Sequence, residues 1–248
     1  MSLFGKQPKP APDPEAFVRA NTAVEAPPLV PEIPLHLASA LVPLWEATEA
    51  ELERMGLPPP YWAFAWAGGQ AIARHLLDTP ETVRGRTVLD FATGSGIAAV
   101  AAMKAGAARV TATDIDRFAA AACRVNAALN GVEVDVTTED LIDSDAGWDV
   151  VLAGDICYEQ PLANRVTAWL RRLAARGAVV LLGDPGRTYL PKQHIEWMVR
   201  YAVKTTRELE DTDVRNAVVW RVTPEADQQP AGQQSANQQS NEPKTLKG

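Results

Sequence analysis

Apolar residues in the middle of the chain follow two different spacings, and their alternation predicts strands separated by helices. Short apolar runs at 86–92 and 109–114 have the length of strands, and the run at 148–154 is apolar almost throughout, as expected for a strand covered on both faces. The alternating segment 132–136 and the apolar run 178–183 predict two further strands.

Helical patterns lie between these strands. An alanine-rich segment at 96–106 ends in glycine, a second helix is expected at 116–130, and apolar residues recur at helical spacing over 162–173. Ahead of the first strand, the apolar residues Ile72, Leu76 and Leu77 predict a further helix after Gly69. Because strand and helix alternate, we expect a doubly wound, mostly parallel α/β sheet. The last two strands, at about 201–209 and 214–222, are joined by an acidic turn and predict an antiparallel hairpin that brings the sheet to seven strands.

The two ends of the chain have a different composition. Twelve of the nineteen prolines precede Tyr61, so residues 1–57 are expected to form a proline-rich arm with short regular structure and one helix at about 43–55. Residues 224–248 are polar and rich in glutamine, and we expect this tail to be disordered. The domain proper is therefore expected at 58–223.

Charge and apolar content narrow the class of protein. The chain has 248 residues, 46% of them hydrophobic, and a formal net charge of −7. This acidic balance argues against the basic surface that binding to nucleic acids or anionic membranes requires. Its two cysteines, Cys123 and Cys157, have no metal-ligand spacing around them, so we expect reduced thiols and no bound metal. Because the sequence shows no long apolar run and no signal-peptide pattern, we expect the protein to be soluble and cytoplasmic. We also expect it to be a monomer.

Glycines and carboxylates follow the first two strands of the expected sheet. Gly94 and Gly96 allow a tight turn and a close approach of ligand to backbone, and Asp90 lies at the end of the strand before them. Asp114 ends the second strand, where a carboxylate can accept both hydroxyls of a ribose. Asp116 is expected to cap the next helix. The turn also satisfies G-x-G-x-x-A, so dinucleotides and other adenosyl ligands both remain open.

Two later strands also end in acids. Asp140 could accept from the exocyclic amine of an adenine and the Leu141 N–H could donate to a ring nitrogen, although an ordinary acidic loop fits equally well. Asp155 and Tyr158 follow the fourth strand and could orient an amine or cationic substrate, with a capped turn as the alternative. Hydride transfer needs neither residue.

Taken together, these motifs resemble those of class I, seven-β-strand S-adenosylmethionine-dependent methyltransferases. The segments VLDFATGSG, TATDID and GDICYE match in order, and the last resembles the D-x-x-Y/F signature of the lysine-methylating group. The segment YWAFAWAGGQ resembles W-x-x-x-W-x-G-G-Q of the bacterial form of a subgroup that methylates the β subunit of electron transfer flavoprotein, and LLGDPGR also resembles this subgroup.

The resemblance implies roles for individual residues. It places Asp155 and Tyr158 at the target amine, with Asp155 as an orienting group or a general base. The residues that it implies for S-adenosyl-L-methionine are Trp62, Trp66, Gly68, Asp90, Thr93, Gly94, Gly96, Asp114, Ile115, Asp140, Leu141 and Gly154.

The function expected from the resemblance is protein-lysine N-methylation, with the electron transfer flavoprotein β subunit as acceptor. One alternative keeps the fold and cofactor but takes another protein, such as a ribosomal protein, or a small amine such as nicotinamide. Two others are a non-catalytic cofactor-binding or interaction module and a nicotinamide-dependent oxidoreductase, the latter supported only by the glycine pattern.

Overall fold

A mixed seven-stranded sheet forms the centre of the part of the chain that the structure describes. The computed structural model describes residues 13–38, 58–205 and 212–224. The strands are β3 (Thr87–Phe91), β4 (Arg109–Thr113), β5 (Asp135–Thr137), β6 (Val150–Gly154), β7 (Val179–Asp184), β8 (Ile195–Lys204) and β9 (Val214–Val222). Their spatial order is β5-β4-β3-β6-β7-β9-β8, and β3 to β7 are parallel while β9 runs antiparallel to both its neighbours. The predicted sheet is therefore confirmed, including its C-terminal hairpin.

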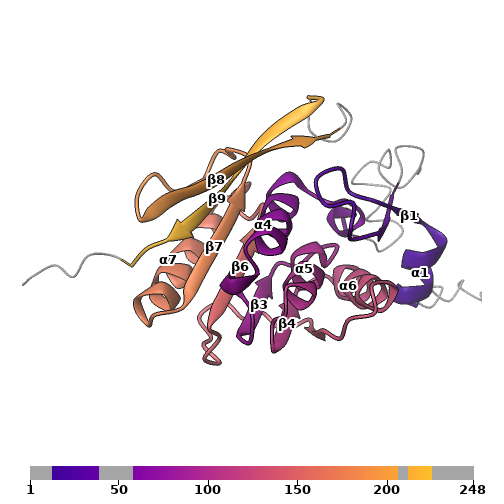
Figure 1. Cartoon of the computed structure of the whole chain (residues 1–248), viewed down its shortest axis with the longest axis horizontal. Coiled ribbons are helices and arrows are strands. Elements are labelled where there is room, and N and C mark those ends of the chain that lie inside the picture. Colours follow the sequence, from indigo (N-terminus) through magenta and orange to yellow (C-terminus); the bar gives the residue numbers. More distant parts are fainter. Residues whose placement is uncertain (1–12, 39–57, 206–211, 225–248) are drawn as a thin grey trace, which may run out of the picture.

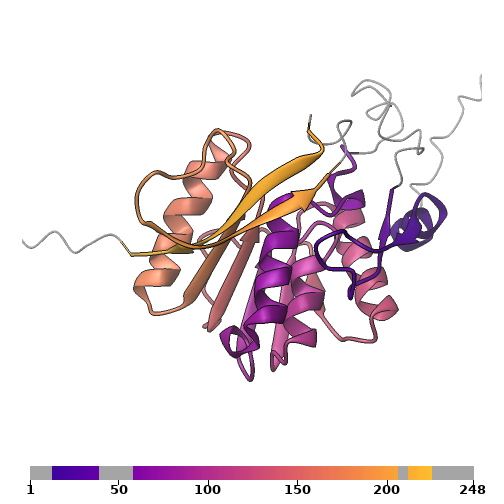
Figure 2. The ribbon, with the colours of Figure 1, turned by 45° about the horizontal axis from the view of Figure 1, so that its top comes forward.

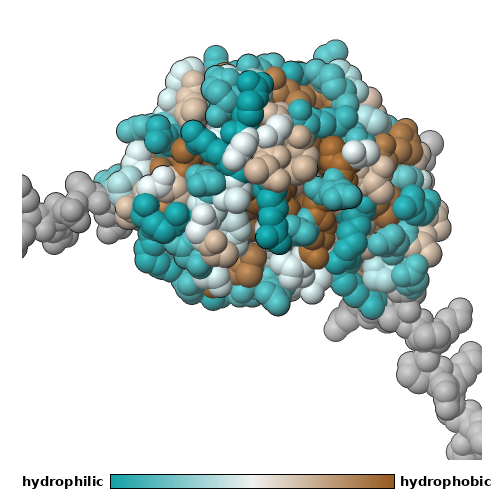
Figure 3. Space-filling view, turned by 60° about the horizontal axis from the view of Figure 1, so that its bottom comes forward, coloured by the Kyte–Doolittle hydropathy of each residue, from teal (hydrophilic) through white to brown (hydrophobic). Residues whose placement is uncertain are grey.

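Helices cover both faces of the sheet (Figure 1). Helices α4 (Ala67–Asp78), α5 (Ile97–Lys104) and α6 (Arg117–Leu129) lie side by side on one face. On the other face, α7 (Leu162–Ala175) packs against β7 and β9, together with apolar residues of the loop between β5 and β6. No helix among the residues that the structure describes has the length and apolar character to cross a membrane. On the face in Figure 3, hydrophilic residues interrupt the apolar patches.

Glycines allow α4 to approach the sheet very closely. A Cβ atom on Gly68 would lie 2.2 Å from the carbonyl oxygen of Gly183, and one on Gly154 would lie 3.0 Å from the amide nitrogen of Gly69. These distances leave no room for a side chain at Gly68 and very little at Gly154. The first turn of α4 consequently rests directly on the ends of β6 and β7.

The N-terminal arm contains short elements that the sequence pattern did not resolve. Helix α1 (Pro14–Ala20) packs against α6, and β1 (Ala23–Glu25) pairs antiparallel with β2 (Leu35–Leu37). Figure 2 shows this arm beside α6, at the end of the row of helices. The helix expected at 43–55 lies outside the described residues, as does the tail expected to be disordered at 224–248 apart from its first residue, and the domain boundaries stay predictions.

Three predicted boundaries were wrong. The strand expected at 132–136 begins only at Asp135, because the Val132 N–H still bonds to a carbonyl at the end of α6. Strand β8 begins at Ile195 rather than near residue 201, since a register shift after Trp197 breaks the alternation and leaves that side chain 61% exposed. The helix expected after Gly69 already begins at Ala67.

Candidate active site

A cavity of about 660 Å³ opens at the carboxyl ends of β3, β4 and β6. Strand β3 lies between β4 and β6, and the order of the strands switches direction here. Strands β4 and β5 follow on one side of β3, whereas β6 and β7 follow on the other. In open α/β sheets, ligands bind at such a switch point. The cavity walls combine carboxylates with aromatic and aliphatic side chains, which suits a ligand that has both polar and flat apolar parts.

The glycine-rich loop after β3 forms one wall of the cavity. Gly94 and Gly96 both have positive φ angles, 50° and 80°, which glycine adopts without strain. Asp114 holds the loop from the neighbouring strand, because its Oδ2 accepts the Gly94 N–H at 3.0 Å. The Asp116 side chain accepts the Phe118 N–H at 2.8 Å and caps α6 as predicted.

Asp90 and Thr93 brace this loop from behind rather than lining the cavity. The Thr93 hydroxyl donates to Asp90 Oδ2 at 2.5 Å, and the Ala99 N–H donates to the same oxygen at 3.0 Å. Burial raises the pKa of Asp90 to about 7. The carboxylate therefore ties the loop to the first turn of α5, and its expected role at a ligand ammonium group stays a prediction.

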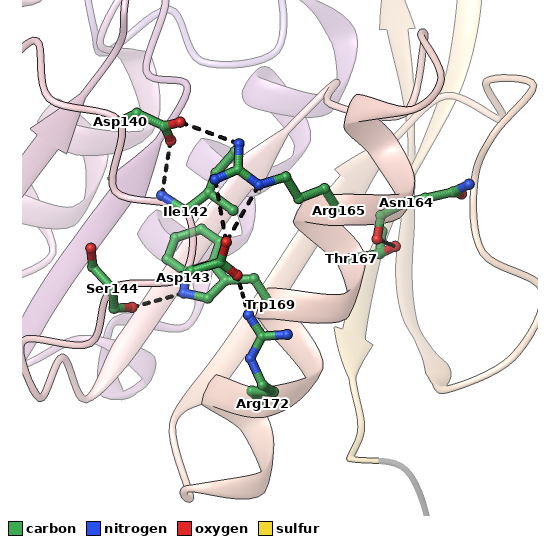
Figure 4. A network of polar contacts seen from close by, with 9 residues as sticks. All are labelled: Asp140, Ile142, Asp143, Ser144, Asn164, Arg165, Thr167, Trp169 and Arg172. Atoms are coloured by element: carbon green, nitrogen blue, oxygen red, sulfur yellow. Dashed lines mark hydrogen bonds and ion pairs between the residues drawn. The ribbon is translucent and has the colours of Figure 1, made fainter.

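A charged network closes the cavity beside the loop between β5 and β6 (Figure 4). Arg165 reaches from α7 to Asp140 Oδ2 at 3.4 Å and to Asp143 Oδ2 at 3.2 Å, and Arg172 pairs with Asp143. Asp140 also accepts the Ile142 N–H at 3.0 Å through its other oxygen. Asp140 and Ile142 line the cavity, so the network shapes its wall at the place expected for the adenine.

Asp155 lies at the opposite side of the cavity and is held by two other elements. Its Oδ1 accepts from Arg187 Nη2 at 2.9 Å, and its Oδ2 accepts the Gly69 N–H of the first turn of α4 at 2.9 Å. The residue has a positive φ of 57° and is 9% exposed. Burial raises the pKa of Asp155 to about 6, Arg187 opposes this rise, and Asp184 adds to it.

Aromatic side chains line the same cavity as Asp155. The Tyr61 ring lies 5.9 Å from the Tyr158 ring and 6.1 Å from the Trp66 ring, centroid to centroid. The Arg187 guanidinium lies 5.6 Å from the centre of the Trp66 ring, and Trp62 is buried deeper in the wall. Tyr61 and Tyr158 are each about half exposed, so they form a rim that an incoming side chain would contact.

Most of the predicted site residues come together in this cavity. Those that line it are Trp62, Trp66, Gly94, Asp114, Ile115, Asp140, Gly154, Asp155 and Tyr158, whereas Gly68, Asp90, Thr93, Gly96 and Leu141 do not. Gly68 serves the contact between α4 and β7, and Leu141 packs towards α7.

Several residues that line the cavity were not among the predicted site residues. Arg187 follows β7, and its place at a strand end is a signal comparable to that of Asp155. Tyr61 belongs to the aromatic segment already singled out. Arg165 carries no sequence signal, because an arginine on an amphipathic helix is ordinary.

Sequence comparisons with known proteins agree on methyl transfer. The family model of ribosomal protein L11 methyltransferase (PrmA) matches residues 73–183. The chain is 38% identical over 218 residues to the electron transfer flavoprotein beta subunit lysine methyltransferase of Xenopus laevis, covering 85% of this chain and 87% of that protein. Its human counterpart is 36% identical over 225 residues, covering 86% and 84%. The crystal structure of magnesium protoporphyrin IX methyltransferase from Synechocystis PCC 6803 with bound SAM aligns with a TM-score of 0.47 at 18% identity, over 62% of this chain and 77% of that one.

Proposed function

The chain belongs to the family of electron transfer flavoprotein β-subunit lysine methyltransferases, and on that premise we propose that its acceptor is the β subunit of electron transfer flavoprotein. As a member of this family it is an S-adenosylmethionine-dependent methyltransferase that acts on lysine side chains of a protein. The observation that carries the proposal is that one cavity is lined by the buried Asp155 carboxylate and by the half-exposed Tyr61 and Tyr158, which suits a long cationic side chain reaching in from a protein surface.

The residues of the cavity fit S-adenosylmethionine. Asp114 offers a carboxylate for the ribose hydroxyls at the end of β4, beside the glycine-rich loop. The half-apolar wall formed by Ile115, Asp140 and Ile142 suits the adenine. Trp66 and Gly154 would enclose the methionine part. When bound, the cofactor supplies a methyl group that is already activated for transfer to a nucleophile.

Asp155 would orient the lysine amine rather than hold its proton. Oδ1 already accepts from both Nη2 and Nε of Arg187, whereas Oδ2 accepts the Gly69 N–H, so a second lone pair on Oδ2 remains for the amine. A carboxylate with a pKa of about 6 is a weak base towards an ammonium group whose reference pKa is near 10.4. Asp155 is therefore not the base, and the amine reacts from the fraction that has already lost its proton in equilibrium with the solvent.

Tyr158 and Arg187 favour the uncharged form of that amine. Burial raises the pKa of Tyr158, so its phenol stays protonated and presents a hydroxyl and an aromatic face. The Arg187 guanidinium neutralises Asp155 and disfavours a second positive charge close to it. A desolvated amine beside these groups has a lowered pKa and an available lone pair.

The acceptor is tested with a labelled methyl donor and two purified proteins. We expect label on the electron transfer flavoprotein β subunit and none on ribosomal protein L11, with mass spectrometry placing it on lysine side chains. Asp155→Ala should abolish transfer, whereas Glu196→Ala, which changes an exposed residue of β8, should not affect it. Label on L11 alone would overturn the proposed acceptor. The cytoplasmic location, the monomeric state and the absence of a nucleic-acid partner stay predictions.

A further inference from the structure

A buried amide side chain joins the N-terminal arm to the glycine-rich loop. Asn126 of α6 is fully buried, its Oδ1 accepts the His36 N–H of β2 at 2.7 Å, and its Nδ2 donates to the Ser95 carbonyl at 2.8 Å. Because a backbone N–H can only donate and a carbonyl can only accept, these partners allow one orientation of the amide. The side chain thus makes one bond to each of two segments that are far apart in the sequence.

The bond to Ser95 acts directly on the wall of the cavity. Ser95 stands between Gly94, whose N–H is held by Asp114, and Gly96. A Cβ atom on Gly96 would lie 2.9 Å from the Sγ of Cys123, so the loop also lies directly on α6 at the next position. The loop is therefore held at Gly94 by Asp114, the carboxylate proposed for the ribose, and at Ser95 and Gly96 by α6.

The arm supports a second part of the same cavity. The Phe17 ring of α1 lies 6.4 Å from the Trp62 ring and 5.0 Å from the Phe118 ring, centroid to centroid. The Ala38 N–H also donates to the Ala63 carbonyl at 2.8 Å, directly after Trp62 in the chain. Since Trp62 lines the cavity, the arm contacts its wall both through the loop and through this tryptophan.

We propose that Asn126 is a positioning residue for the cofactor and that docking of the arm, residues 13–38, through Asn126 holds the glycine-rich loop in its binding conformation. Thermodynamic linkage then requires the converse, namely that bound cofactor stabilises the docked arm. The proposal concerns the cofactor alone, so it holds or fails independently of the acceptor.

Asn130, the C-cap residue of the same helix one turn further along, provides a matched control. Its Nδ2 donates to the Pro34 carbonyl of the arm at 2.7 Å and to the Asn126 carbonyl at 2.9 Å. It therefore contributes a comparable contact to the arm, but no hydrogen bond links it to the glycine-rich loop among the described residues. A substitution at Asn130 therefore shows how much the affinity for the cofactor changes when a contact to the arm is lost and the hydrogen bond to the loop is kept.

The first experiment measures the affinity of the full chain for S-adenosylhomocysteine by calorimetry. Loss of one buried hydrogen bond that positions the loop should raise Kd about tenfold in Asn126→Ala, whereas Asn130→Ala should stay within about twofold of the wild type. Urea unfolding of both variants separates this effect from a general loss of stability. Equal changes in Kd for the two variants would overturn the proposal.

The second experiment needs no substitution. Hydrogen exchange of the His36 amide, which bonds to Asn126, is compared with and without S-adenosylhomocysteine, with the amides of β8 and β9 as a reference for global stabilisation. We expect ligand to slow exchange at His36 at least about threefold more than in the reference strands. Equal slowing in both regions would refute the coupling even if the Asn126 variant did not fold.

Discussion

Replacing Asp155 by asparagine separates its contribution to stability from its contribution to methyl transfer. The carboxylate is 9% exposed, and burial raises its pKa from 3.8 to about 6. Because the folded state binds its proton more tightly than the unfolded state, the stability from this group is fully present below pH 3.8. That stability is lost as the pH rises through about 6.

The size of the effect follows from these two pKa values. Between pH 5 and pH 8, the proton linkage of one such carboxyl removes about 1.4 kcal/mol from the free energy of unfolding of the wild type. The amide in Asp155→Asn does not titrate, so the variant escapes this loss. The difference in unfolding free energy, variant minus wild type, should therefore increase by about 1.4 kcal/mol over this range.

Urea unfolding followed by tryptophan fluorescence at pH 5, 6, 7 and 8 measures this difference. In parallel, methyl transfer by Asp155→Asn should fall about 100-fold, because a charged hydrogen bond to the amine is lost, while Kd for S-adenosylhomocysteine stays within about twofold. A difference in unfolding free energy that does not change with pH would refute the burial argument. Transfer at the wild-type rate would refute the placement of the acceptor.

Four further substitutions test other parts of the site. Asp114→Ala should weaken S-adenosylhomocysteine binding about 10- to 100-fold in calorimetry, since the Gly94 N–H and the ribose both lose a charged acceptor, and an unchanged Kd would contradict its role. Gly68→Ala should lower the free energy of unfolding by about 3 kcal/mol because its Cβ would lie 2.2 Å from a backbone oxygen. Gly69→Ala, whose nearest contact is a methyl group at 3.2 Å, should change it by less than about 1 kcal/mol. Arg187→Gln should raise the pKa of Asp155 and move the acid limb of the pH profile of kcat/KM to higher pH, whereas an unmoved limb would show that the pair does not control it.

Local sequence signals determined the candidate residues at strand ends, because each depends on only a few neighbouring positions. Asp114, Asp140 and Asp155 follow apolar runs, and parallel strands bring their carboxyl ends to one edge of the sheet. The capping role of Asp116 was equally readable from the residues that follow it. These predictions required no knowledge of which strands are neighbours.

Contacts between distant segments could not be predicted in this way. Gly68 was expected at the ligand but does not line the cavity; its nearest neighbour is the Gly183 carbonyl oxygen, from a strand more than a hundred residues later. Arg187 pairs with Asp155 only because β6 and β7 are adjacent, and the partners of Asn126 lie 90 and 31 positions away.

The sequence by itself determined the α/β class, the order of strands and helices, the family and the acids at the strand ends. The tertiary structure alone decided which of those acids face the cavity, which brace the loop from behind, and that the arm contacts the cavity wall. The physical reason is that periodicity and turn chemistry are local properties of the chain, whereas burial, pKa shifts and hydrogen-bond partners depend on which surfaces meet.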